Sequence, residues 1–256
     1  MTYFHNKSEL DSFPKTEVEF FNLIKDDVDV VFDIGSRDDI DYIKNSYDKS
    51  REFHLFEPVQ EFLSNCQEQI ENLNPSDKIE NKIFLNPYGI GSEEGTMSYY
   101  SNTQSFVFRT HNATSIDSGM SFEIKTLDGY CTENSVDSID FLKIDIEGME
   151  IDVLNGGKNI INSTTKIIQF EFGLCILDRK INPDDLVGWF DKEKFDIYLQ
   201  RVDPRHPYYS TNSDMLTPLS SEVYDIIKSD MIKGAGCNLI AIRKDISDKI
   251  YSKSKK

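Results

Sequence analysis

Carboxylates stand at the ends of several apolar runs in this sequence. Five carboxylates lie in the last residues of an apolar run or just after it: Asp33, Glu57, Asp145, Glu147 and Glu171. Carboxylates placed in this way can bind the two hydroxyls of a ribose, hold a cationic group, accept a proton from a hydroxyl, or bind a divalent metal ion. Because charges are costly to bury, their clustering at strand ends indicates a functional site.

Short apolar runs predict strands that are buried on both faces of a sheet. They are Val28–Ile34, Phe53–Phe56, Lys82–Leu85, Ile139–Ile144, Lys166–Phe172, Asp196–Arg201 and Cys237–Arg243. Segments with helical spacing lie between them: Glu61–Leu73, Met149–Ile161 and Pro183–Asp191. A hairpin and a further short strand are expected from Gly95–Tyr100, Ser105–Arg109 and Glu123–Leu127. This alternation predicts an α/β fold with an open, mostly parallel sheet, which binds ligands beyond the carboxyl ends of its strands.

The loop after the first run lacks the glycine pattern GxGxxG that binds a dinucleotide pyrophosphate, which disfavours an NAD-dependent dehydrogenase. Asp33 would repel phosphates and suits a ligand with an amino group. Glu57 follows Asp33 at about the 20-residue interval that separates the first loop from the ribose-binding acid in nucleoside sites. The two acids together indicate a nucleoside with a cationic amino-acid arm, a description that fits S-adenosylmethionine.

Five stretches of the sequence resemble the FkbM-type S-adenosylmethionine-dependent methyltransferases. They are VVFDIGS (30–36), HLFEP (54–58), KTLDGYC (125–131), IDFLKIDIEGMEIDVLNGG (139–157) and KIIQFEF (166–172). The resemblance implies a Rossmann-like class I methyltransferase fold, with a seven-stranded sheet whose last strand is antiparallel. It also implies O-methyl transfer, with a hydroxyl of a sugar, a glycan or a small natural product as the acceptor.

The resemblance also implies roles for individual residues. Those expected to bind S-adenosylmethionine are Asp33, Gly35, Ser36, Glu57, Pro58, Val59, Tyr88 and Asp145. Asp145, Glu147 and Glu171 are expected to face the transferred methyl group and the acceptor. One departure concerns the first loop, where Ser36-Arg37-Asp38-Asp39 replaces the second glycine and the asparagine of many family members.

A sugar hydroxyl is a poor nucleophile, so a general base or a metal ion should help to remove its proton. The candidates for the base are Asp145, Glu147, Glu171 and His111, with Asp145 preferred. Oxygen ligands at neighbouring strand ends also suit Mg²⁺ or Mn²⁺, which makes Asp145 and Glu171 a candidate metal site. Simpler structural roles are that Asp145 caps the next helix, or that Lys143 pairs with a carboxylate.

The charge of the whole chain limits the choice of partners. Its 256 residues carry a formal net charge of −17, so an acidic surface would repel nucleic acid and anionic membranes. A nucleic-acid methyltransferase, or a non-catalytic binding module with the same fold, remains the alternative. We expect no membrane insertion and, without an apolar leader at the N-terminus, a cytoplasmic location.

The chain is expected to form one methyltransferase domain over residues 1–247, with a helical lead-in over 1–27. Its polar, lysine-rich tail over 248–256 is expected to fray.

Overall fold

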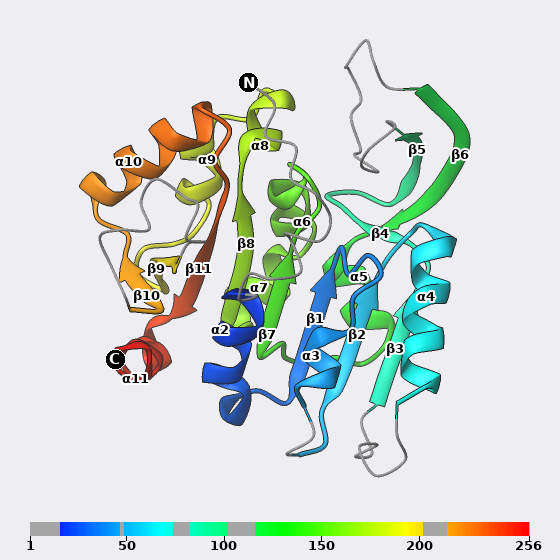
Figure 1. Cartoon of the computed structure of the whole chain (residues 1–256), viewed down its shortest axis with the longest axis horizontal. Helices are drawn as coiled ribbons and strands as arrows, with labels where there is room; N and C mark the ends of the chain where they lie inside the picture. Colours follow the sequence, from blue (N-terminus) through cyan, green and yellow to red (C-terminus); the bar gives the residue numbers. More distant parts are fainter. Residues whose placement is uncertain (1–15, 47–48, 74–81, 102–115, 202–213, 256) are drawn as a thin grey trace.

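The computed structural model describes residues 16–46, 49–73, 82–101, 116–201 and 214–255. Within these ranges the main sheet has eight strands in the order β10-β9-β11-β8-β7-β1-β2-β3 (Figure 1). Their bounds are β1 Val30–Ile34, β2 Glu52–Phe56, β3 Lys82–Asn86, β7 Phe141–Ile144, β8 Ile167–Phe172, β9 Phe195–Gln200, β10 Leu216–Pro218 and β11 Cys237–Arg243. The expected strands therefore form one sheet.

The strand directions confirm the expected α/β fold with an open, mostly parallel sheet. Neighbours among β1, β2, β3, β7 and β8 pair in parallel. The late strand β11 lies antiparallel between β8 and β9, as expected for a class I methyltransferase fold. The expected number of seven strands is one too low within the described residues, because the short strand β10 pairs with the outer edge of β9.

Helices cover both faces of this sheet. Their bounds, with the 3-10 turn η1, are α2 Thr16–Ile24, η1 Lys25–Asp27, α3 Asp41–Lys44, α4 Gln60–Glu71, α5 Leu127–Glu133, α6 Glu150–Gly156, α7 Lys158–Ser163, α8 Leu174–Asp178, α9 Pro183–Gly188, α10 Ser221–Ile232 and α11 Lys244–Ser254. One apolar core joins the sheet to α5 through α10, and a second joins its other face to α2, α3, α4 and α11. No helix of the described residues is both long and apolar enough to cross a membrane.

A second, smaller sheet stands beside the carboxyl ends of β1 and β2 (Figure 1). It has the order β4-β6-β5, with β4 Gly89–Ile90, β5 Gly95–Ser101 and β6 Ile116–Lys125. β5 and β6 pair antiparallel, so the expected hairpin strand Gly95–Tyr100 is present. The expected partner strand Ser105–Arg109 lies outside the described residues, and β6 is much longer than the expected Glu123–Leu127.

The lysine-rich tail does not fray up to residue 255, which corrects the expectation. Helix α11 continues to Ser254, and Ile250 is fully buried in the core beneath it. Lys249 and Lys253 both donate hydrogen bonds to the carboxylate of Asp27. Burial alone would raise the pKa of Asp27, but these two hydrogen bonds outweigh it and lower the pKa. The tail is therefore fastened to the N-terminal part of the chain.

Candidate active site

Backbone hydrogen bonds bring the ends of four strands together at one edge of the sheet. The amide of Gly35 donates to the carbonyl of Phe56 at 3.0 Å, which joins β1 to β2. The amide of Asp145 donates to the carbonyl of Ile34 at 3.0 Å, which joins β7 to β1. The amide of Glu57 donates to the carbonyl of Asn86 at 3.1 Å, which joins β2 to β3. The parallel register thus places the predicted strand-end acids side by side.

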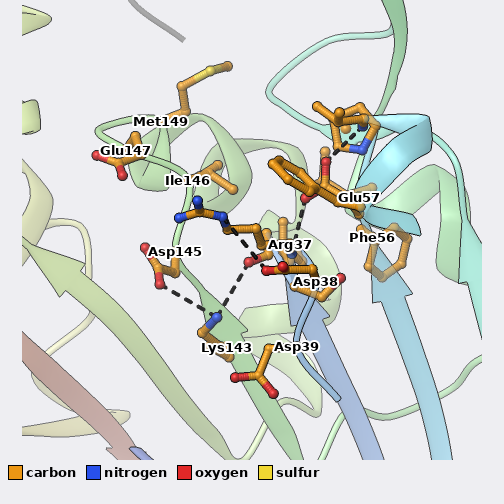
Figure 2. Close-up of a pocket in the computed structure, with 18 of the residues that line it drawn as sticks. Arg37, Asp38, Asp39, Phe56, Glu57, Lys143, Asp145, Ile146, Glu147 and Met149 are labelled. Carbon is orange, nitrogen blue, oxygen red and sulfur yellow. Dashed lines mark hydrogen bonds and ion pairs between the residues drawn. The ribbon is translucent and has the colours of Figure 1, made fainter. Parts of the chain in front are cut away.

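A cavity of about 560 Å³ lies over this edge (Figure 2). Its lining comprises Glu17, Ile34, Gly35, Ser36, Arg37, Asp38, Asp39, Phe56, Glu57, Pro58, Val59, Phe62, Gly89, Ile90, Phe122, Ile124, Lys143, Asp145, Ile146, Glu147 and Met149. The volume falls within the range of small-molecule and cofactor sites, about 300–1,000 Å³. The lining has an apolar side, made largely by β4, β6 and α4, and a charged side at the ends of β1 and β7.

The loop after β1 is built for close contact with the loop after β7. Gly35 has φ +84°, and a Cβ at this position would lie 2.0 Å from the carbonyl oxygen of Asp145. Only glycine fits there without moving the backbone. The next residue, Ser36, is 2% exposed, and within the described part of the chain its hydroxyl has no hydrogen-bond partner. A buried hydroxyl without a partner is costly, so Ser36 is suited to receive a polar ligand group.

Glu57 is held rigidly at the end of β2. One carboxylate oxygen accepts a hydrogen bond from the amide of Arg37 at 3.0 Å, and the other accepts one from the amide of Val59 at 2.7 Å. Burial raises the pKa of Glu57 to about 7, although these two hydrogen bonds act in the opposite direction. Since a carboxylate oxygen accepts more than one hydrogen bond, Glu57 retains capacity for a ligand diol.

Lys143 forms the centre of the charged side. Its ammonium lies 3.3 Å from Oδ1 of Asp33. It also lies 3.5 Å from Oδ2 of Asp145 (Figure 2). Burial by itself lowers the pKa of Lys143, but the charges of Asp33 and Asp145 outweigh it and raise the pKa. Burial raises the pKa of Asp33 to about 6, despite the neighbouring ammonium. Lys143 thus orients Asp145 at the cavity wall, while Asp33 lies behind the lining residues.

The turn after β7 is fixed from two sides. Glu147 lines the cavity with φ +58°, an uncommon conformation for a non-glycine residue. The thiol of Cys175 donates a hydrogen bond to the carboxylate of Glu147 at 2.9 Å. Glu150, which is 1% exposed, accepts hydrogen bonds from the amides of Gly148 at 3.1 Å and Ile146 at 3.3 Å. Sequence reasoning does not single out Glu150 as functional. The feature that could have indicated its role is its place at the first residue of a helix just after the turn.

Of the other residues predicted to bind the cofactor or to act in catalysis, some line the cavity and some lie outside its lining. Pro58 and Val59 line the cavity. Tyr88 lies outside the lining and donates to Oδ1 of Asn86 at 3.1 Å. Glu171 on β8 is also outside the lining, and burial together with the charges of Asp145, Glu147 and Glu150 raises its pKa to about 9.

Two of the predictions for catalysis gain no support from the structure. His111 lies outside the described residues. Among the residues that are described, no group of three or more His, Cys, Asp or Glu side chains is arranged to hold a metal ion. The metal site expected at Asp145 and Glu171 is therefore not supported by the described residues.

Glu17 of helix α2 is a cavity residue that sequence reasoning missed. It lies more than 100 residues before Lys143 and Asp145, whose charges act on it, and it lines the same cavity. An acid in the first turn of a helix is favoured by the helix dipole alone, so its position carries no distinctive signal. The only sequence feature that indicates the position of Glu17 is its spacing from Phe21. The two residues are one helical turn apart, so they lie on the same, buried side of the helix.

Comparisons with known proteins identify the family of this chain. A family model described as "Methyltransferase FkbM domain" matches residues 33–196. The 2-O-methyltransferase NoeI of Sinorhizobium fredii is 24% identical over 167 residues, which cover 59% of this chain and 66% of that protein. The match therefore spans slightly less than two thirds of this curated relative.

Two solved structures are also similar to this chain. A methyltransferase FkbM from Methylobacillus flagellatus has a TM-score of 0.44 and 16% identity, covering 68% of this chain and 40% of that one. An S-adenosylmethionine-dependent methyltransferase from Clostridium acetobutylicum has a TM-score of 0.33 and 9% identity, covering 97% of this chain and 82% of that one. Because the family model spans more than half of the sequence, this chain belongs to the FkbM-domain methyltransferases.

Proposed function

We propose that this protein uses S-adenosylmethionine to methylate a hydroxyl group of a sugar, a glycan or a small natural product. The observation that carries the proposal is the convergence of Glu57 and Asp145 on a single cavity at the carboxyl edge of the sheet. The name of the Sinorhizobium relative, a 2-O-methyltransferase, supports oxygen as the methylated atom.

The residues of the cavity fit the three parts of this cofactor. Glu57 would bind the ribose diol, and the neighbouring Pro58 and Val59 would border the adenine ring. Ser36, whose buried hydroxyl has no hydrogen-bond partner among the described residues, would take a polar group of the amino-acid arm. The excess of acids over bases in the lining favours a cation.

The chemistry requires an acceptor oxygen, a methyl donor and a base. When bound, S-adenosylmethionine supplies a methyl group on a positively charged sulfur. Transfer would form the bond from the acceptor oxygen to the methyl carbon and break the carbon–sulfur bond, whose electron pair would stay on sulfur. We assign the proton of the hydroxyl to Asp145, because this carboxylate lines the cavity and Lys143 holds it in position.

Binding is tested first, by calorimetry and thermal shift with S-adenosylmethionine, S-adenosylhomocysteine and NAD. A ligand at 100 times its Kd should stabilise the fold by about 2.7 kcal/mol. Glu57→Gln should weaken S-adenosylhomocysteine binding roughly tenfold to a hundredfold, because it removes charge-assisted hydrogen bonds. The matched control is Glu61→Gln on the exposed side of α4, which should bind as the unmodified protein does. A response to NAD alone would overturn the proposal.

Turnover is tested with a methyl-labelled cofactor and a panel of neutral sugars, glycans and phenolic natural products. Asp145→Asn should retain cofactor binding and lose about 10²–10⁴-fold in kcat, the usual contribution of a general base. Asp152→Asn, whose carboxylate pairs with Arg179 away from the cavity, should keep full activity. Cofactor binding without methylation of any acceptor would favour the alternative of a non-catalytic binding module.

A further inference from the structure

We propose that Glu17 of helix α2 binds the ammonium group of the amino-acid arm of S-adenosylmethionine. The inference rests on the proposed function and deepens it. It adds to the site a residue from the N-terminal helix, which lies before the first strand and outside the stretch matched by the family model. Three features of the molecule support this role: the fastening of α2, the orientation of the carboxylate and the charges around it.

Helix α2 is fastened over the sheet by a buried apolar face. Phe20, Phe21 and Ile24 are fully buried against the core that contains Phe141 of β7. Because residues four apart lie on the same side of a helix, Glu17 extends the face of Phe21 by one turn toward the strand ends. The helix therefore carries the carboxylate of Glu17 to the cavity at the edge where β1 and β7 end.

A specific contact orients this carboxylate. Nδ2 of Asn238, on the antiparallel strand β11, donates to Oε1 of Glu17 at 2.8 Å. Within the described part of the chain, Oε2 of Glu17 has no hydrogen-bond partner and remains available at the cavity. On the same helix, Glu19 pairs with Arg201 at the end of β9, which provides a second link between α2 and the sheet.

The surroundings of Glu17 match a ligand group that carries one positive and one negative charge. An amino-acid arm ends in an ammonium and a carboxylate, and this side of the cavity holds the ammonium of Lys143 beside the carboxylates of Glu17 and Asp145. Asp33 and Asp145 already pair with Lys143. Burial raises the pKa of Glu17, so a bound cation would stabilise the charged form that the site now penalises. Among Glu17, Asp33 and Asp145, only Glu17 lines the cavity without forming an ion pair with Lys143.

The test compares two ligands that differ only in the amino-acid arm. S-adenosylhomocysteine has the arm, whereas 5′-methylthioadenosine keeps the nucleoside and the sulfur without it. By calorimetry, Glu17→Gln should weaken S-adenosylhomocysteine binding roughly tenfold to a hundredfold, the usual effect of losing a hydrogen bond to a charged group. Binding of 5′-methylthioadenosine should change less than about twofold. The control Glu61→Gln, on the exposed side of α4 and outside the cavity lining, should leave both affinities unchanged.

The outcomes separate this inference from the proposed function. Failure of the unmodified protein to bind either ligand would refute the proposed function itself. Equal losses for both ligands in Glu17→Gln would show that the residue only supports the fold, and unchanged binding of both would exclude it from the site; each result overturns the inference alone. Asn238→Ala provides an independent variant, because it leaves the carboxylate in place and removes only its anchor. It should weaken S-adenosylhomocysteine selectively, by less than Glu17→Gln does.

Discussion

Glu171 shows how a single residue can oppose the stability of the fold. It lies on β8 behind the cavity, where burial and the charges of Asp145, Glu147 and Glu150 raise its pKa to about 9. In the unfolded chain its pKa would return to about 4.5. Between these two values the folded protein holds a proton that the unfolded chain has released, so stability must fall as the pH rises through this window.

Glu171→Gln should remove this contribution. The amide is neutral at every pH, so the free energy of unfolding should decline less steeply between about pH 5 and pH 9, by at most about 1.4 kcal/mol per pH unit. Urea unfolding at pH 5, 7 and 9 measures the slope for both proteins. Glu193→Gln, at an exposed position, serves as the control and should keep the original slope. Identical slopes in all three proteins would mean that Glu171 is ionised normally.

Sequence predicts a side chain of the site best when a strand carries it there. Glu57 and Asp145 follow apolar runs directly, so the parallel sheet alone puts them at one edge. Glu17 and Glu150 could not be predicted in this way. Glu17 reaches the cavity through the packing of a helix, whereas the side chain of Glu150 lies outside the lining and turns back onto amides of its own loop. Neither position follows from an apolar run that ends at the site.

At the scale of elements, the glycine pair after β7 shows why an apparently continuous helix is interrupted. The sequence predicts one helix over Met149–Ile161, but α6 ends at Gly156 and α7 begins at Lys158. A Cβ at Gly156 would lie 2.0 Å from the carbonyl oxygen of Gly91, so the end of α6 packs directly on the backbone that follows β4. This contact joins the main sheet to the small sheet that borders the cavity.

Two glycine-to-alanine substitutions should therefore have opposite effects. Gly156→Ala should destabilise the protein by about 1–3 kcal/mol, because the methyl group has to displace backbone atoms. Gly188→Ala, at the end of α9, adds a methyl group with no atom within 4 Å among the described residues, apart from its chain neighbours and its own helix backbone. It should be neutral or stabilising by up to about 1 kcal/mol. Urea denaturation at one pH gives both values. A loss in Gly188→Ala as large as that in Gly156→Ala would refute the role assigned to the close contact.

The helices and strands differ in how clearly the sequence predicts them. The buried strands were predictable because a short, continuous apolar run between turn residues is typical of a strand covered on both faces. Strand β6 was predicted too short, because Asp117, Ser118 and Gly119 have low strand propensity and only its pairing with β5 extends it. The expectation that residues 248–256 fray is wrong up to residue 255, because the abundant lysines of the tail obscure the spacing of Ile246 and Ile250, which marks one apolar face of α11.

At the scale of the whole molecule, the two ends of the described chain are joined. Lys249 and Lys253 of α11 contact Asp27, just after the helix that carries Glu17. The C-terminal helix thereby helps to hold the N-terminal helix over the cavity edge. These cationic contacts occur in a molecule whose formal net charge is −17, so most of the remaining surface charges repel one another.

Salt should therefore act on stability and on binding in opposite directions. Raising NaCl from about 0.1 M to about 1 M shortens the Debye length from about 10 Å to about 3 Å. Weaker self-repulsion should raise the free energy of unfolding, whereas screening of the acidic cavity should weaken S-adenosylmethionine more than S-adenosylhomocysteine, which lacks the positive charge on sulfur. Urea unfolding and calorimetry at both salt concentrations measure the two effects. An unchanged ratio of the two affinities would mean that the acids lining the cavity do not select the cationic ligand by their charge.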